Sequence, residues 1–377
     1  MIDKNLTKTE AACLAFIKNY TPQTAIYNYT SSLCLEAVLK AAQILNKPEW
    51  IVWVRERACQ FLKEDGSVTG FEKEEYSMDK IRTGNLYFSL YNLSGEEKYK
   101  KAMDSFIDMM KSQPRTASGG YWHKKRYPDQ MWLDGFYMSE PLCVKYAGKW
   151  GDLKVALDEA KNQLSLMYSH TVKPNGLLLH AWDESGKMYW ADKKTGCSGY
   201  VWSRAVGWVI MAIADILELL PATDEFEGYR AFFADYALKL ASALVKVQDV
   251  STGMWYQVTD MGGYENNFLE TSGTLMFAYG FAKMNRMGIL DNSFRDAAVR
   301  AFDGVVKFKT YYDKDENFHI KDICKSAGLG KAEDTSPFRD GSYNYYTLGE
   351  ERAVDNMHGV GSFILAGLEI EYGGKKA

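Results

Sequence analysis

The sequence predicts an all-α protein, an (α/α)6 barrel with a central cleft lined by aromatic loops, and three observations support this prediction. Apolar residues recur at helical spacing along most of the 377 residues, whereas strand-like alternation is confined to short stretches such as 176–190 and 253–259. A second set of helical segments mixes small residues with large ones. No linker rich in Pro, Gly or Ser divides the chain, so we expect a single domain over residues 1–377.

Helices are predicted first from amphipathic segments, in which apolar residues recur at positions i, i+3, i+4 and i+7. In chain order, this pattern occurs in residues 9–19, 31–46, 49–63, 96–112, 151–168, 225–247 and 293–309. A helix of this kind buries one face and leaves the other in water, which suits the outside of a barrel.

The inner helices are predicted from segments that are apolar on more than one side. In chain order, they are 81–93, 131–142, 202–217, 270–283 and 358–370, with Gly84, Gly135, Gly207, Gly273 and Gly359 near their starts. An earlier segment, 31–42, fits the same place with serine instead of glycine. Small residues let neighbouring backbones approach closely. An open helical array is the alternative, but the irregular period and the long aromatic loops favour a closed ring of six.

Composition and charge exclude several classes of protein. With 46% hydrophobic residues, 31 Gly and 8 Pro, the chain is neither disordered nor collagen-like. Its 45 Lys and Arg against 49 Asp and Glu give a net charge of −4, so we expect no nucleic-acid partner. No apolar run approaches the roughly 20 residues of a membrane helix, so we expect no membrane partner.

Cysteines, histidines and the first residues bear on cofactors and location. The six cysteines are scattered without a C-x-x-C pair, which predicts reduced core thiols. The five histidines are too dispersed for a metal site, and no Walker loop, GxGxxG or serine nucleophile elbow is present, so we expect neither metal nor cofactor. The start lacks an apolar signal-peptide region, which predicts a cytoplasmic protein, although a chain whose signal peptide had been removed would read the same.

Aromatic residues gather in the loops that run into the inner helices. The segments are GGYWHKKRYPDQMWLDG, GLLLHAWDE, YVWSRAVGW, GMWYQVTD, NNFLETSG and FRDGSYNYY. In a barrel these loops would converge on one face and line one cleft. Aromatic faces stack on the C–H surfaces of sugars and charged groups bond hydroxyls, so the pattern favours a carbohydrate ligand, although each aromatic residue alone could belong to the core.

Two acids occupy equivalent places in successive units, Asp79 in SMDKIRTG and Asp134 in QMWLDGFY. A lone Asp at a helix start is usually an N-cap. Asp134 differs because Leu133 and Phe136 flank it, and this apolar setting, together with a nearby Asp79 carboxylate, should raise its pKa. A carboxyl group that keeps its proton near neutral pH can act as a general acid on a sugar.

Further candidates for the site lie on later segments. His180 in LLLHAWDE is at least as apt to bind a ligand as to be a buried structural residue. Arg204 starts an inner helix with Trp202, which we expect to face differently, and Trp208, which shares its face at i+4. A buried Arg there needs an acidic partner, either a core carboxylate or a substrate carboxylate.

The segments YWHKKRYPDQMWLDGFYM, LLLHAWDE, VWSRAVGW, NFLETSG and RDGSYNYY resemble, in order, those of the unsaturated rhamnogalacturonyl hydrolases of glycoside hydrolase family 105. The unsaturated glucuronyl hydrolases of family 88 are related to them. The resemblance runs from about residue 27 to about residue 370 and implies an (α/α)6 barrel. It also implies that the enzyme hydrates the enol ether of a 4,5-unsaturated uronic acid, with Asp134 protonating C4 and assisting water addition at C5. Asp79 would hold water or ring hydroxyls and keep Asp134 protonated.

The resemblance also implies the substrate and its contacts. The substrate-binding candidates are Tyr29, His123, His180, Trp202, Arg204 and Trp208. The implied substrate is the unsaturated galacturonyl end of a rhamnogalacturonan disaccharide that a lyase has released from pectin. Three alternatives stay open: the same chemistry on glucuronyl oligosaccharides from ulvan, arabinogalactan or glycosaminoglycan, an inverting glycosidase on this fold, and a carbohydrate-binding module. The sugar beyond the uronate and the oligomeric state are not predicted.

Overall fold

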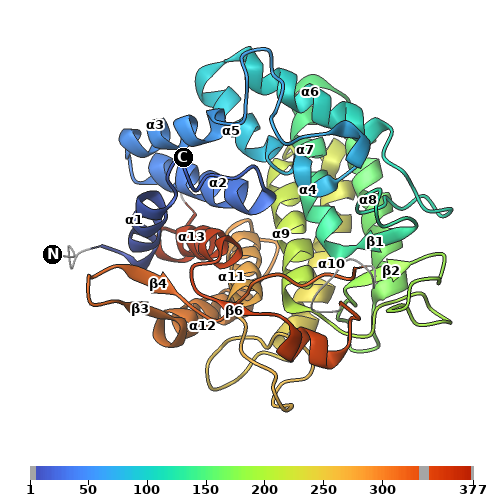
Figure 1. Cartoon of the computed structure of the whole chain (residues 1–377). Coiled ribbons are helices and arrows are strands. Elements are labelled where there is room, and N and C mark those ends of the chain that lie inside the picture. Colours follow the sequence, from blue (N-terminus) through green and yellow to red (C-terminus); the bar gives the residue numbers. More distant parts are fainter. Residues whose placement is uncertain (1–5, 331–338, 375–377) are drawn as a thin grey trace.

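A computed structural model describes residues 6–330 and 339–374, and within these ranges six helices form a closed ring (Figure 1). Phe338, the first residue of the last aromatic segment, lies outside the described residues. The inner helices are α2 (Tyr29–Ile44), α5 (Gly84–Ser94), α7 (Leu133–Trp150), α9 (Ser203–Leu219), α11 (Thr271–Arg286) and α13 (Met357–Glu371). Each packs against the next, and α13 packs against α2. The prediction of an (α/α)6 barrel is confirmed.

A second layer of helices surrounds the ring. These outer helices are α1 (Lys8–Asn19), α3 (Pro48–Cys59), α6 (Glu97–Lys111), α8 (Leu153–Thr171), α10 (Glu227–Val245) and α12 (Asn292–Lys309). From α3 onward, each packs against the inner helix that precedes it, whereas α1 packs against α13 at the other end of the chain. The Thr9 amide donates to the Glu371 carboxylate over 3.1 Å, which ties the two ends together.

Glycines bring α9 and α11 close together, as the small residues in the inner segments indicated. A Cβ added to Gly273 of α11 would lie 2.7 Å from the Cβ of Ser203, at the start of α9. One added to Gly207 of α9 would lie 2.7 Å from the sulfur of Met276. Glu270 is the N-cap of helix α11, and its carboxylate accepts hydrogen bonds from the Ser272 and Gly273 amides.

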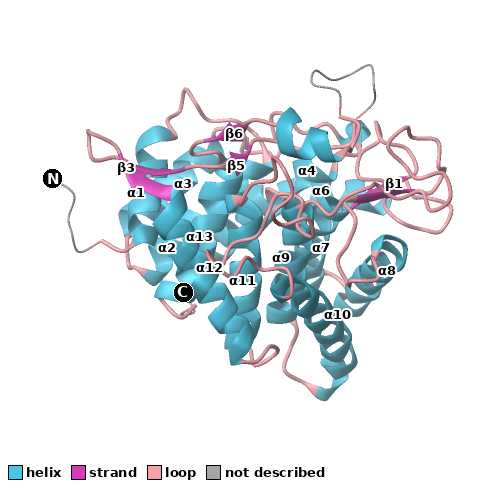
Figure 2. Cartoon of the chain, turned by 90° about the horizontal axis from the view of Figure 1, so that it is seen from below, coloured by secondary structure: helices cyan, strands magenta, loops and turns pink. Residues whose placement is uncertain are grey.

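The remaining elements are short and lie mostly at one end of the barrel, together with the long loops (Figure 2). Three antiparallel pairs join β1 (Gln130–Trp132) to β2 (Ala181–Asp183), β3 (Thr310–Tyr312) to β4 (Phe318–Ile320), and β5 (Ile323–Cys324) to β6 (Arg352–Ala353). The described residues also form helix α4 (Met78–Ile81), 3₁₀ turns at Lys73–Glu75 and Asp224–Phe226, and a π-helical segment at Tyr345–Gly349. Of the strand-like stretches, 176–190 contains β2, whereas 253–259 forms isolated bridges only.

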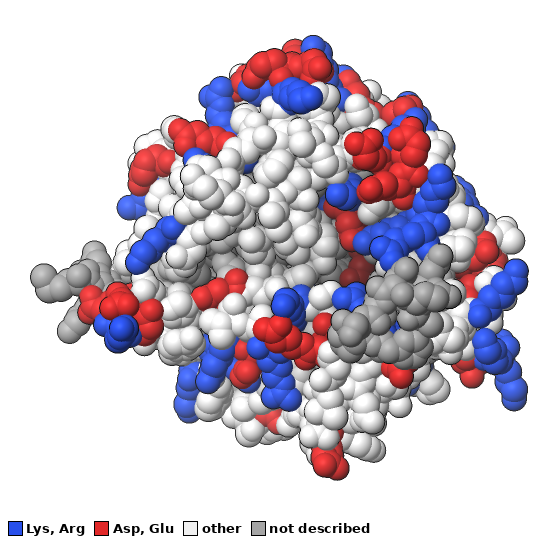
Figure 3. All heavy atoms as spheres, in the orientation of Figure 1, with Lys and Arg blue, Asp and Glu red and all other residues white. Residues whose placement is uncertain are grey.

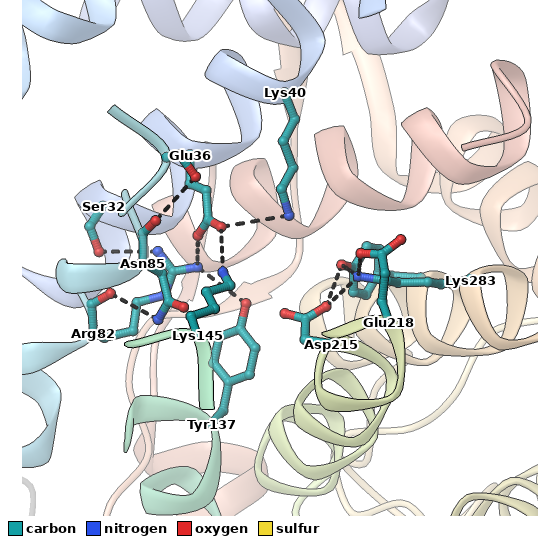
Figure 4. Close-up of polar contacts among 12 residues, drawn as sticks. Ser32, Glu36, Lys40, Arg82, Asn85, Tyr137, Lys145, Asp215, Glu218 and Lys283 are labelled. Atoms are coloured by element: carbon teal, nitrogen blue, oxygen red, sulfur yellow. Dashed lines mark hydrogen bonds and ion pairs between the residues drawn. The ribbon is translucent and has the colours of Figure 1, made fainter. Parts of the chain in front are cut away.

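Two buried ionic clusters lie inside the ring of inner helices (Figure 4). In the first, the Arg82 guanidinium donates to the Glu36 carboxylate over 2.6 Å and to the Tyr137 hydroxyl over 3.1 Å. In the second, Lys283 pairs with Asp215 at 2.7 Å and with Glu218 at 2.7 Å. The Lys40 amine lies 3.6 Å from Glu36. Both clusters therefore join neighbouring inner helices through charge as well as through apolar packing.

Within the described residues, the structure shows no membrane-spanning helix, no disulfide and no cluster of metal-ligating side chains. None of the helices among them combines the length and the apolarity needed to cross a bilayer. The six cysteines all lie within them, and each is a free thiol. In the same part of the chain, no group of three or more His, Cys, Asp or Glu side chains is arranged to hold a metal ion.

Candidate active site

A cleft of about 480 Å³ opens where the N-terminal ends of several inner helices meet the loops. Figure 3 shows a hollow on this face with acidic and basic side chains at its edge. Among the lining residues, Tyr29 is the first residue of α2, Asp134 lies in the first turn of α7 and His358 lies in the first turn of α13. Because helix N-termini carry partial positive charge, this end of the barrel favours an anionic ligand.

Asp134 reaches the cleft because β1 leads directly into α7. The pairing of Trp132 with Ala181 in the β1–β2 ladder brings the adjacent His180 beside it, and the Leu133 amide donates to the His180 carbonyl over 3.0 Å. The Asp134 Oδ2 lies 3.3 Å from the His180 Nε2, and the Asp134 side chain is 14% exposed. His180 is fully buried, and its Nδ1 lies 2.7 Å from the Tyr346 hydroxyl.

The pKa of Asp134 is lowered, which corrects the prediction that it is raised. Burial does act to raise this pKa, but His180, together with the positive charge of Arg204, outweighs burial and favours the carboxylate. The expected repulsion from Asp79 is also weakened, because Lys124 forms an ion pair with that carboxylate. The free protein therefore holds Asp134 ionised.

Asp79 lies in α4, the short helix that precedes α5, and its side chain is 18% exposed. Its Oδ2 accepts a hydrogen bond from the Lys124 amine, and its Oδ1 lies 3.4 Å from the His123 Nε2. The Met78 amide donates to the His123 carbonyl over 3.3 Å, so α4 and the loop before β1 are held together. Burial opposes the charge of Lys124, but Asp79 raises the pKa of the amine.

His123 lies beside two aromatic rings in the lining of the cleft. Its ring stacks on Trp132 with centroids 4.9 Å apart, and Trp132 in turn stacks on Tyr127 at 4.7 Å. Burial lowers the pKa of His123 to about 4, so the imidazole is neutral. Flat aromatic surfaces next to polar groups are what a sugar ring needs from a binding site.

Tyr29 lines the same cleft and is tied to the last inner helix. Its hydroxyl lies 2.8 Å from the His358 Nε2, and its ring packs edge-on against Trp208. Burial raises the pKa of Tyr29, and the Asp79 and Asp134 carboxylates add to this effect. The hydroxyl is therefore un-ionised and close to both acids.

Arg204, Trp202 and Trp208 are buried beneath the cleft lining. The Arg204 guanidinium donates to the Cys324 carbonyl and, over 3.4 Å, to the Ser272 hydroxyl, whereas its Nε has no hydrogen-bond partner. The guanidinium also lies 4.7 Å from the centre of the Trp202 ring. The expectation that Trp202 and Arg204 face differently is thus wrong, because Trp202 precedes α9 and its extended backbone turns the ring back over the first helical turn.

The structure brings four of the predicted site residues to the cleft surface, namely Tyr29, Asp79, His123 and Asp134. His180, Trp202, Arg204 and Trp208 form the layer beneath them. Sequence reasoning missed Lys124, although it adjoins His123, and it missed Arg339 and the turn from Asp355 to His358. The HGVG sequence at the start of the last inner helix was the available signal for His358.

An (α/α)6 barrel with two carboxylates and several aromatic rings in one cleft defines a class of carbohydrate-processing enzymes. The model of Glycosyl Hydrolase Family 88 matches residues 5–372, and the chain belongs to this family. It is a glycoside hydrolase. The resemblance of its motifs to families 105 and 88 is confirmed.

Three similar proteins place the chain more closely. A family 105 glycoside hydrolase of C. acetobutylicum ATCC 824 is 32% identical, with a TM-score of 0.91, over 97% of this chain and 100% of that one. The unsaturated rhamnogalacturonyl hydrolase YesR of Bacillus subtilis (strain 168) is 23% identical over 209 residues, which are 52% of this chain and 55% of that protein. The unsaturated glucuronyl hydrolase of Bacillus sp. GL1 shares the fold, with a TM-score of 0.66 and 14% identity over 97% and 95% of the chains.

Proposed function

We propose that this protein removes a 4,5-unsaturated galacturonic acid from the non-reducing end of rhamnogalacturonan disaccharides released from pectin by a lyase. The observation that carries the proposal is the placing of Asp134 and Asp79 in one cleft, with aromatic walls and helix N-termini directed at it. The similarity to a family 105 enzyme over the whole chain supports the reaction type. The partial similarity to an unsaturated rhamnogalacturonyl hydrolase supports the choice of sugar.

In this proposal Asp134 is the general acid. The uronate carboxylate brings a negative charge and displaces water, and both effects raise the pKa of Asp134 in the complex. The protonated Asp134 then gives its proton to C4 of the double bond, and positive charge develops on C5 and the ring oxygen. Water adds to C5 and returns a proton to Asp134. The hemiketal opens, and the hemiacetal left at C1 releases the next sugar, so protons balance over the cycle.

The other site residues position the substrate in this proposal. Asp79 accepts a hydrogen bond from a ring hydroxyl or from water, while Lys124 balances its charge. Lys124 from the cleft wall and Arg204 from beneath also offset the charge of the incoming uronate. His123 and Trp132 present the flat surface on which the unsaturated ring stacks.

The test is to incubate the protein with a panel of lyase-generated disaccharides and to follow the ultraviolet absorbance of the double bond. We expect absorbance to fall fastest with galacturonyl–rhamnose, and not at all with Asp134→Asn. A faster fall with glucuronyl disaccharides would move the substrate to glycosaminoglycan-type or ulvan-type products. Cleavage of saturated disaccharides without any absorbance change would instead indicate an ordinary glycosidase.

A further inference from the structure

A chain of short polar contacts joins the cleft to the start of α13. The Tyr29 hydroxyl lies 2.8 Å from the His358 Nε2, and the His358 Nδ1 lies 2.7 Å from the Asn356 Oδ1. The same Asn356 oxygen accepts a 3.1 Å hydrogen bond from the His358 amide, as the N-cap of α13. All three residues line the cleft.

These contacts fix the direction of every hydrogen bond in the chain. A backbone amide can only donate, so the Asn356 atom that it meets is the side-chain oxygen, which can only accept. The His358 Nδ1 must therefore carry a hydrogen to bond that oxygen. In a neutral imidazole the other nitrogen is then a bare acceptor, so the Tyr29 hydroxyl donates its hydrogen to the His358 Nε2.

The surroundings of His358 keep its imidazole neutral. The residue is only 5% exposed, and burial lowers its pKa well below the ordinary value, with the nearby Arg204 adding to the effect. The titratable and charged groups around the ring are Arg204 of α9, Tyr29 and Cys34 of α2, and Asp355 and Lys325 of the cleft loops. Asp355 pairs with His319, and Lys325 pairs with Glu351.

We propose that Asn356 and His358 are positioning residues that make the Tyr29 oxygen a pure hydrogen-bond acceptor toward the cleft. The group that Tyr29 recognises must then be a donor, which means a free sugar hydroxyl or a water molecule. An oxygen blocked by a methyl, acyl or sulfate group offers no hydrogen, and it leaves the buried phenol oxygen unsatisfied. Free-hydroxyl uronides are therefore the preferred substrate class at this position. The substrate part of the proposal rests on the proposed function, whereas the direction of the hydrogen bonds does not.

Nitrogen NMR on the protein labelled with ¹⁵N-histidine tests the direction without any substrate. We expect the His358 signals, identified by their loss in His358→Gln, to show a protonated Nδ1 and a bare Nε2 across the neutral pH range. A hydrogen on Nε2 overturns the proposal. This result stands even if the protein turns out not to act on unsaturated uronides.

A second test reverses the direction of the hydrogen bond between His358 and Tyr29. Asn356→Asp keeps an equally good N-cap but places a carboxylate against Nδ1, which raises the pKa of His358. Below that pKa both ring nitrogens donate, so the Tyr29 hydrogen must turn into the cleft. We expect kcat/KM of Asn356→Asp, divided by that of the wild type, to fall about tenfold as the pH is lowered and to recover at high pH.

The matched control is Asn28→Asp, which adds the same charge at the N-cap of α2 in the same cleft, without a histidine partner. The kcat/KM of Asn28→Asp, divided by that of the wild type, should not fall as the pH is lowered, in contrast to the ratio for Asn356→Asp. A ratio for Asn356→Asp that stays flat with pH, or that only matches the control, contradicts the positioning role.

A third test uses substrates in which one hydroxyl at a time carries a methyl group. For one of these substrates, kcat/KM of the wild type should be about tenfold lower than for the unmethylated substrate, whereas kcat/KM of Tyr29→Phe should not fall. Equal losses in both proteins would contradict recognition by Tyr29.

Discussion

At Asp134, burial and neighbouring charge act in opposite directions on one carboxyl group. Burial alone would load the group with a proton, and a general acid needs that proton. His180, 3.3 Å away, and the buried Arg204 instead favour the carboxylate in the free protein. The proton must therefore be acquired together with the substrate. The pH dependence of the free enzyme and that of the enzyme–substrate complex should differ for this reason.

The first prediction concerns the acid itself. Asp134→Asn keeps the size of the side chain but cannot supply a proton, and general acid catalysis typically contributes about 10²–10⁴-fold. Activity should fall by at least that factor while the circular dichroism spectrum and the Tm stay those of the wild type. Turnover close to normal would remove Asp134 from the mechanism.

The second prediction concerns the sign of the influence of His180. His180→Gln removes an imidazole that favours the Asp134 carboxylate, so the pKa of Asp134 should rise and the acid should stay protonated to higher pH. The basic limb of kcat/KM, which reports the free enzyme, should therefore move to higher pH. A basic limb that stays in place, or that moves to lower pH, would show that His180 does not control the acid.

Sequence reasoning found the two carboxylates but predicted the wrong direction for the pKa shift of Asp134. The apolar neighbours of Asp134 are adjacent in the chain and visible in the sequence. His180 and Arg204 are far from it in the chain and reach it only through the β1–β2 pairing and the packing of α9. His358 was missed for the same reason, since its contact with Tyr29 joins the two ends of the chain.

At the scale of elements, Arg82 explains why the predicted inner helix 81–93 is broken. The chain forms α4, turns at Arg82 and Thr83, and begins α5 at Gly84. The Arg82 side chain is 1% exposed and bonds Glu36 on α2 and Tyr137 on α7 (Figure 4). It therefore anchors the segment that carries Asp79, three residues earlier.

The third prediction tests this anchor against a matched ion pair. Arg82→Met and Lys283→Met each remove the closest cation of a buried carboxylate, Glu36 in the first case and Asp215 in the second, and breaking such a pair costs up to about 3–5 kcal/mol of stability. We expect both variants to have a lower Tm. At temperatures where both are folded, only Arg82→Met should lower kcat, because Asp79 loses its position. Equal kcat values in the two variants would make Arg82 a stabilising residue only.

The fourth prediction concerns the hairpin of β3 and β4. His319 on β4 lies 2.6 Å from Asp355 and 3.2 Å from Asp313, and although burial opposes it, these two acids raise the pKa of His319. A raised pKa means that the stabilisation is fully present below the unfolded value of about 6.5 and is lost as the pH rises through the folded value.

The measurement is the Tm as a function of pH for the wild type and for His319→Gln. The wild type should have the higher Tm at about pH 5, and the difference should shrink as the pH rises above the folded pKa of His319. A difference that does not change with pH would mean that His319 stabilises the hairpin by packing and not by charge.

Element by element, the sequence predicted the helices better than their ends. Every predicted helical segment contains a helix, although 31–46 forms the inner helix α2, because the apolar spacing that marks a helix lies within a short stretch of sequence. Helix α7 runs on to Trp150 through Pro141, beyond the predicted end at 142, because the buried surface continues past the proline. The stretch 253–259 is extended but pairs only through single bridges, so its alternation does not indicate a strand.

At the scale of the whole molecule, the ring depends on close approach between α9 and α11. Gly273 has no room for a side chain, because a Cβ would lie 2.9 Å from the backbone carbonyl carbon of Ser203. The same contact supports the first turn of α9, which carries Arg204. Stability of the ring and geometry beneath the cleft are therefore linked through one glycine.

The fifth prediction uses two glycines as a matched pair. Gly273→Ala should destabilise the protein by about 1–3 kcal/mol, as overpacking typically does, and should also lower activity. Gly228→Ala on the outer helix α10, where nothing lies within 4 Å of the added carbon, should be neutral or raise stability by up to about 1 kcal/mol. Equal effects at both sites would mean that α9 can move away without cost.

The packing of α1 against α13 has a consequence for biosynthesis. Helix α1 leaves the ribosome before the other helices of the ring, yet α13, against which it packs, is the last inner helix to emerge. The nascent chain therefore carries α1 without its contact to α13 until the other inner helices have been made. Five hairpins can assemble in order as they appear, but the sixth joins the two ends of the chain. The barrel therefore closes only after translation has passed Glu371.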